Sequence, residues 1–268
     1  MESLSVLGGH DKDGRPEDLN LTLRRGDVVC VVGPTGAGKS RFLEDISCLA
    51  QGDTPTGRSI LVDGEPPPGE LRYSLEGRVV AQLSQNMNFI VDLTVGEFIR
   101  MHGECRNPAG RGGPGDGMEA MVERIVAAAN RLTGEALCAE MPVTRLSGGQ
   151  SRALMVADTG LLSPSPVVLI DELENAGVDR AGALELLVRE DKIVLVSTHD
   201  PALALLGARR LCIRGGAVRR VIETSAEERQ NGAILSAVNG KFMELREMLR
   251  NGASLEFDMA SFLKEAVV

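Results

Sequence analysis

The stretch Gly33-Pro34-Thr35-Gly36-Ala37-Gly38-Lys39-Ser40 decides the fold of this 268-residue chain. It follows the mostly β-branched run 27–32 and opens a segment, Lys39 to about Ala50, that is expected to form a helix. Strand, glycine-rich loop and helix in this order are typical of a phosphate-binding loop, because glycines let backbone N–H groups converge on an anion at the helix N-terminus. Lys39 is then expected to reach the β- and γ-phosphates, and Ser40 to ligate Mg²⁺.

An acidic pair follows a second apolar run further along the chain. Val167–Ile170 reads as a strand and is followed directly by Asp171 and Glu172. Ligands bind at the carboxyl ends of the strands in open α/β sheets, so we expect Asp171 to hold Mg²⁺ there through water. Glu172 is the candidate general base that polarises the attacking water. The ordinary alternative, an exposed acidic pair at a strand end, is disfavoured by the phosphate loop upstream.

Strand and helix patterns alternate over most of the chain. This alternation predicts an α/β fold of the P-loop NTPase type, with a mainly parallel sheet. Antiparallel β elements are also expected, with a hairpin around Gly215-Gly216, and the alternation of Leu19–Leu23 predicts a half-buried strand. From about 86 to 150 the periodicity is helical, which predicts an inserted α-helical subdomain. A stretch dense in Gly and Pro, residues 107–117, divides it and favours a surface loop.

Composition narrows the classes of partner. The net charge of -9 disfavours a nucleic-acid partner, because such binding needs basic patches. The chain has five cysteines, which is an odd number, and no two of them have the spacing of a metal site or a redox motif. This favours reduced thiols in the cytoplasm. Because residues 1–20 are polar and lack an apolar core, we expect no signal peptide, and because no apolar stretch reaches about 18 residues, we expect no segment that spans a bilayer. If the protein powers transport, the pore therefore belongs to another chain.

The last part of the chain, 223–268, is expected to be a helical extension. Apolar residues recur there every three or four positions, which predicts one apolar helix face; they are Ile234, Val238, Phe242, Leu245 and Leu249. We expect this stripe to pack on the chain's own core. A partner groove or a dimer contact is the alternative.

Two further motifs complete a recognisable set. Leu146-Ser147-Gly148-Gly149-Gln150 lies between the phosphate loop and Asp171, and Ser197-Thr198-His199-Asp200 closes the series. In this order the four motifs resemble the ATP-binding cassette (ABC) ATPase family, from about Leu19 to Val221. The resemblance implies an ABC ATP-binding domain over residues 1–222, with ATP and Mg²⁺ as its ligands.

The resemblance also implies roles for single residues. His199 would sense the γ-phosphate and stabilise the transition state. Gln85 has the spacing of the family's glutamine loop, which touches Mg²⁺ or the attacking water and links the ATP site to the helical subdomain; Gln82 fits that spacing less well.

The pentapeptide implies a partner. In the family, Ser147, Gly148, Gly149 and Gln150 would contact the γ-phosphate held by another subunit, in a head-to-tail dimer that closes on two ATP molecules. The bland alternative is an ordinary helix cap, since Ser is a good N-cap.

Several positions depart from the family and mark a divergent subfamily. The family usually stacks an aromatic ring on the adenine base, but this sequence has no aromatic residue at that position. His10 stands in the equivalent stretch and is the candidate for stacking on the base; the alternative is that His10 is an exposed loop histidine. Weaker stacking would leave GTP open as the nucleotide. Arg41 replaces a small hydroxyl residue and either pairs with the α-phosphate or faces solvent. Asp179 is the candidate aspartate that contacts the facing subunit, although the segment before it is one residue longer than usual.

Two functions remain open. The leading hypothesis is the ATP-hydrolysing subunit of an ABC transporter. Such a chain is expected to form a homodimer and to act on separate transmembrane subunits, in the cytoplasm at the inner face of the cell membrane. The alternative is a soluble ABC ATPase that drives cofactor or metallocluster assembly or remodels protein complexes. DNA-repair and chromosome ATPases would need coiled-coil arms or basic grooves, which this sequence lacks.

Overall fold

The computed structural model describes residues 1–73, 78–84, 89–106, 116–171 and 177–266. Within them the central sheet has the strand order β5-β6-β7-β3-β8-β9. Its strands are β3 (Val28–Val32), β5 (Val80–Leu83), β6 (Val167–Asp171), β7 (Ile193–Ser197), β8 (Arg209–Arg214) and β9 (Ala217–Glu223). All neighbours are parallel except β8 and β9, which form the antiparallel hairpin expected around Gly215-Gly216. The predicted mainly parallel α/β fold is confirmed.

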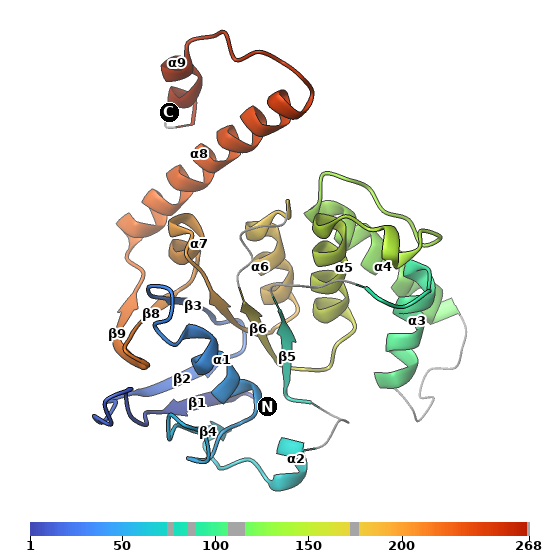
Figure 1. The fold of residues 1–268 in the computed structure, drawn as a ribbon. Coiled ribbons are helices and arrows are strands. Elements are labelled where there is room, and N and C mark those ends of the chain that lie inside the picture. The colour runs from blue at the N-terminus through green and yellow to red at the C-terminus, as the bar shows by residue number, and fades with distance from the viewer. Residues whose placement is uncertain (74–77, 85–88, 107–115, 172–176, 267–268) are drawn as a thin grey trace.

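A smaller antiparallel sheet has the order β2-β1-β4. It consists of β1 (Ser3–Leu7), β2 (Asn20–Arg24) and β4 (Ser59–Val62). Leu4 and Val6 of β1 are fully buried, yet sequence analysis assigned no strand there. This sheet and helix α1 (Lys39–Ser47) lie together on one side of the central sheet (Figure 1).

The central sheet separates two hydrophobic cores. Val167 and Leu169 of β6 belong to the core shared with α1 and the small sheet, while Val168 and Ile170 belong to the core beneath the helices. Successive strand residues point to opposite faces, so a strand buried on both sides reads as a continuous apolar run. Helix α1 ends earlier than expected, because Leu49 turns the backbone with a φ of 50°.

Helices cover the second face of the central sheet. The expected helical insert contains α3 (Val95–Arg106), α4 (Asp116–Leu132), the 3₁₀ turn Val143–Arg145 and the start of α5 (Gly148–Leu161). Helices α6 (Arg180–Arg189) and α7 (Pro201–Leu206) follow the insert, and the short α2 (Gly69–Tyr73) precedes it. Figure 1 shows α3, α4 and α5 grouped on one side of the sheet, beyond β5. The domain boundary at 222/223 stays a prediction.

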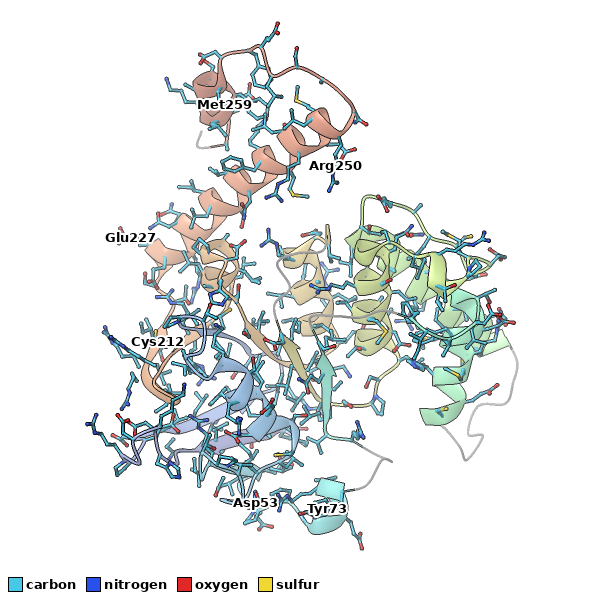
Figure 2. All side chains as sticks on the ribbon, viewed as in Figure 1. Asp53, Tyr73, Cys212, Glu227, Arg250 and Met259 are labelled. Carbon is cyan, nitrogen blue, oxygen red and sulfur yellow. The ribbon has the colours of Figure 1, made fainter. Side chains whose placement is uncertain are left out.

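The C-terminal region forms a helical hairpin of α8 (Ala226–Arg250) and α9 (Met259–Lys264). Helix α8 packs on α7, where Gly232 lies against Leu205, and then runs away from the sheet (Figures 1 and 2). The expectation that its apolar stripe packs on the chain's own core is wrong for most of the stripe. Leu245 is buried, but Phe242 is 48% exposed and Leu249 is 57% exposed. The two core clusters found among the described residues contain no residue of α8, so neither of them covers the part of the stripe that extends past α7. None of the described helices is long and apolar enough to cross a membrane.

Candidate functional site

The phosphate loop connects β3 to α1. Gly38 caps the helix in a left-handed conformation with φ 108°, which side chains rarely adopt. A Cβ atom at this position would lie 3.0 Å from the Cα atom of Gly216. The hairpin turn between β8 and β9 therefore packs so closely on the loop that only glycine fits at Gly38.

Lys39 and His199 meet at the centre of the site. Lys39 is only 7% exposed, and its Nζ lies 3.0 Å from the carbonyl oxygen of Gly33 and 2.8 Å from Nε2 of His199. An ammonium group can only donate, so Nε2 of His199 accepts this hydrogen bond and the ring proton belongs on Nδ1. Two motifs 160 residues apart thus converge on one point.

Ser40 and Asp171 form the second convergence. The hydroxyl of Ser40 donates to Oδ2 of Asp171 across 3.4 Å. Asp171 pairs in register with Ser197 of β7, so Asp171 and the segment that carries His199 share one edge of the sheet. A hydroxyl and a carboxylate at this separation are oxygen donors suited to Mg²⁺, so these residues fit the expected metal. Glu172 and Gln85 lie outside the described residues.

A cavity of about 490 Å³ extends from the phosphate loop to the N-terminal segment. Its lining includes Lys39, Ser40, Arg41, His199 and His10. His10 is exposed, and its Nδ1 donates to the carbonyl oxygen of Asp11 at 3.2 Å. The side chain of Arg41 also lies beside Glu44, with 3.3 Å between Nε and the carboxylate. The structure therefore brings His10 and Arg41 to the cavity that holds the phosphate-binding residues.

Ser147 begins α5 and is its N-cap. Its side chain accepts from the backbone N–H of Gln150, and the Gln150 side chain accepts from the N–H of Ser147, which together make a capping box. Gln150 also donates to the carbonyl oxygen of Ala136 at 3.1 Å. The bland interpretation of this segment as a helix cap is therefore confirmed as a local structure. Ser147 does not line the cavity at the chain's own phosphate loop.

Asp179 caps α6, accepting from the backbone N–H of Gly182 at 3.1 Å. The next residue, Arg180, is hydrogen-bonded to Asp200, which follows His199 and also accepts from Asn239 of α8 at 3.3 Å. Burial raises the pKa of the Asp200 carboxyl, but the backbone N–H of Leu203 and the Arg180 guanidinium outweigh it, so the net shift is downward. This carboxylate thus joins three helices beside His199.

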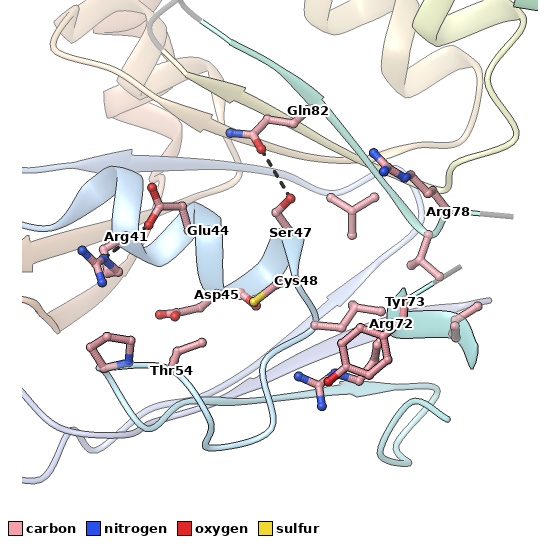
Figure 3. Close-up of a pocket in the computed structure, with 15 residues that line it drawn as sticks. Arg41, Glu44, Asp45, Ser47, Cys48, Thr54, Arg72, Tyr73, Arg78 and Gln82 are labelled. Carbon is pink, nitrogen blue, oxygen red and sulfur yellow. Dashed lines mark hydrogen bonds and ion pairs between the residues drawn. The ribbon is translucent and has the colours of Figure 1, made fainter. Parts of the chain in front are cut away.

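A second cavity of about 480 Å³ lies between α1, α2 and β5 (Figure 3). Figure 3 shows Arg72, Tyr73 and Arg78 on one side of it, facing Cys48 at the end of α1. Gln82 lines the same cavity and accepts from the hydroxyl of Ser47 at 3.3 Å. Gln82 therefore reaches α1 from β5 but not the phosphate loop.

Sequence reasoning missed a buried ion cluster beneath the loop. Arg58 is fully buried, with Nε 2.7 Å from Glu17 and Nη1 2.9 Å from Asp45. Its Nη2 donates to the carbonyl oxygen of Gly216 at 2.7 Å. Burial alone would lower the pKa of the guanidinium, but the two carboxylates raise it above its ordinary value. The cluster ties the small sheet to α1 and to the turn that supports the loop.

Comparisons with known proteins agree with this geometry. A family model described as "ABC transporter" matches residues 16–175. An uncharacterized ABC transporter ATP-binding protein of Methanocaldococcus jannaschii is 48% identical over 264 residues, which cover 98% of each chain. A cobalamin import ATP-binding protein of Halobacterium salinarum is 33% identical over 70% of this chain, which matches only 46% of that protein.

Solved structures share the fold. A subunit of an ABC transporter complex from Clostridium perfringens gives a TM-score of 0.62 at 20% identity, covering 93% of this chain and all of that one. A dimeric ATP-binding cassette in a post-hydrolysis state with ADP and Pi gives 0.60 at 23% identity, covering 83% of this chain and 99% of that chain. At such identities the likeness extends to the fold alone.

Proposed function

The chain belongs to the ATP-binding cassette family, and on that premise we propose that it binds and hydrolyses ATP as the ATP-binding subunit of an ABC transporter. The observation that carries this proposal is the convergence of Lys39, His199, Ser40 and Asp171 at one end of the central sheet. Lys39 and Ser40 come from the phosphate loop, Asp171 from the end of β6 and His199 from the segment after β7. Together they supply a cation and the oxygen ligands that a nucleoside triphosphate with Mg²⁺ requires.

Each residue of the site has a separate proposed role. The loop N–H groups and Lys39 would bind the phosphates. His199 would donate to the γ-phosphate from Nε2, which requires a proton on that nitrogen once Lys39 has turned to the phosphates. Ser40 and Asp171 would hold Mg²⁺, which neutralises charge on the phosphates. Glu172 would take the proton of the attacking water, and Gln85 would contact Mg²⁺ or that water. His10 and Arg41 would bind the base and the α-phosphate.

The site is completed by a second copy of the chain. Ser147 and the exposed Gly148 start a helix, so their N–H groups and the helix dipole favour an anion, yet they do not line the chain's own cavity. Head-to-tail pairing would place Ser147, Gly149 and Gln150 on the partner's γ-phosphate and Asp179 at the interface. Among the fold neighbours are dimeric cassettes, which agree with such pairing.

The transporter role favours separate transmembrane subunits and a cytoplasmic position at the inner face of the membrane. The names of the relatives support this role over soluble cofactor assembly or complex remodelling. Affinity capture from native membranes tests it: recovery of an integral membrane protein is expected, and recovery of soluble partners alone would favour the assembly function.

The hydrolytic part of the proposal has its own test. Wild-type protein should release phosphate from ATP in the presence of Mg²⁺, and Glu172→Gln should retain ATP binding while losing that activity. Phosphate release by Glu172→Gln at the wild-type rate would show that Glu172 is not the base. Absence of ATP binding by the wild type would remove the proposal as a whole.

A further inference from the structure

Lys12 lines the cavity of the phosphate loop, although no motif points to it. Its Nζ donates to the carbonyl oxygen of Gly36 at 2.9 Å. Gly36 lies at the middle of the loop, where the backbone turns with φ 74°. Lys12 thus brings a positive charge to the rim of the loop from the N-terminal segment.

The turn between β8 and β9 holds the backbone of Lys12 in place. The backbone N–H of Lys12 donates to the carbonyl oxygen of Gly215 at 2.9 Å, and Gly216 donates to the carbonyl oxygen of Ala37 at 2.8 Å. A Cβ atom on Gly216 would lie 3.1 Å from Cγ of Lys12. The same turn therefore contacts both the lysine and the phosphate loop and sets the distance between them.

The neighbouring Asp11 holds the segment rigid. Its carboxylate is buried and accepts from the backbone N–H groups of Asp13 and Arg15, each at 2.9 Å. Arg219 binds its second oxygen. The hydrogen bond from the Arg15 N–H, followed by that from Arg219, lowers the pKa of Asp11, so the carboxylate stays charged. Lys12 therefore projects from a fixed turn.

Lys12 differs from the other cationic side chains that line the cavity in the group that it contacts. Lys39 is hydrogen-bonded to His199, and Arg41 lies beside the carboxylate of Glu44. Across the described ranges Lys12 has no carboxylate within ion-pair distance, and the neighbouring Asp11 is occupied by Arg219. An ammonium group neutralised by nothing but a carbonyl dipole attracts an anion that enters the cavity.

We propose that Lys12 binds the phosphate chain of the nucleotide directly, with its Nζ moving from the Gly36 carbonyl to phosphate oxygens. The inference rests on the proposed nucleotide site and adds to it a binding residue supplied by the N-terminal segment. A hydrogen bond between two ionised groups replaces one between the ammonium group and a neutral carbonyl, and this exchange favours the bound nucleotide.

Affinity for ADP tests the proposal in the full-length protein. Lys12→Met should weaken ADP binding about tenfold, and Lys12→Arg should restore most of it. Arg15→Met is the matched control, because it removes a positive charge from the same turn, where the Arg15 side chain is 74% exposed and lies away from the cavity. It should bind ADP as the wild type does.

The thermal midpoint without nucleotide separates ligand binding from support of the loop. If Lys12 binds phosphate, Lys12→Met leaves this midpoint unchanged and reduces only the rise that ADP causes. The proposal is overturned if Lys12→Met binds ADP like the wild type, or if its midpoint without ADP falls and Lys12→Arg fails to restore affinity. Failure of wild-type protein to bind ADP would instead refute the nucleotide site itself.

Discussion

Nζ of Lys39 lies 2.8 Å from Nε2 of His199, so the lysine of the phosphate loop and the histidine after β7 point at the same small volume. Under the proposed function, a γ-phosphate in that volume would replace this contact and accept from Nζ of Lys39 and from a protonated Nε2 of His199. Lys39 would carry the permanent charge that binds the ground state, whereas His199 would contribute where charge develops during hydrolysis.

His199→Ala is therefore expected to lower the rate of ATP turnover about 100-fold or more while leaving ATP affinity close to that of the wild type. His10→Ala is the companion variant, because it changes the other end of the same cavity and should weaken affinity without lowering turnover at saturating ATP. Equilibrium binding and steady-state phosphate release measure both quantities. Equal loss of binding and turnover in His199→Ala would contradict this division of roles.

The 3.4 Å separation of the Ser40 hydroxyl and the Asp171 carboxylate predicts a metal dependence. Asp171→Asn should raise the Mg²⁺ concentration needed for half-maximal turnover by about 10–100-fold, because Asp171 would orient the metal's ligands. Binding of ATP without metal should stay unchanged, since Asp171 then makes no favourable contact with the phosphates. A titration of turnover with Mg²⁺ measures this shift, and equal midpoints for Asp171→Asn and the wild type would contradict this metal site.

The buried cluster around Arg58 predicts a large loss of stability. Arg58→Met leaves Glu17 and Asp45 buried without their cation and should lower the free energy of unfolding by about 3–5 kcal/mol. Arg100→Met is the control, since Arg100 pairs with Glu119 at the surface, and it should cost less than about 1 kcal/mol. Chemical denaturation measures both, and similar losses for the two variants would contradict the importance of the cluster.

Thiol labelling tests the burial of β3. Burial raises the pKa of the Cys30 thiol to about 11, and its Sγ donates to the carbonyl oxygen of Leu203. At neutral pH this thiol is therefore protonated as well as covered, whereas Cys105 and Cys138 are exposed. Mass spectrometry should find Cys138 and Cys105 labelled first and Cys30 labelled only after unfolding. Labelling of Cys30 at the rate of Cys138 in folded protein would contradict the structure.

Local signals in the sequence were sufficient for the centre of the site. The glycine loop between β3 and α1, and the polar residues directly after the apolar runs of β6 and β7, each carry a pattern within a few residues. Parallel strands then bring Asp171 and His199 to one edge, which follows from topology once the strands are recognised.

Other features depend on contacts that no local pattern records. Arg58 binds carboxylates of residues that lie 41 and 13 positions away in the sequence, and Lys12 binds a loop residue 24 positions away. The periodicity of α8 identified residues that share a face but not what covers that face, so Phe242 and Leu249 were wrongly expected to be buried. Burial of such residues is decided by tertiary packing.

The central claim is that each ATP site combines the phosphate loop of one copy with Ser147 of another. Lys39→Ala should disable the loop, and Ser147→Arg should block the helix start that would face the partner's nucleotide, so neither variant alone should release phosphate. A mixed dimer of the two contains one site with an intact Lys39 and an intact Ser147.

Phosphate release by an equimolar mixture of Lys39→Ala and Ser147→Arg protein tests this claim most directly. The account predicts that the mixture regains activity that both separate variants lack, in proportion to the mixed dimers formed. A mixture that stays inactive although mixed dimers are present, or a Ser147→Arg variant that is active alone, would contradict it.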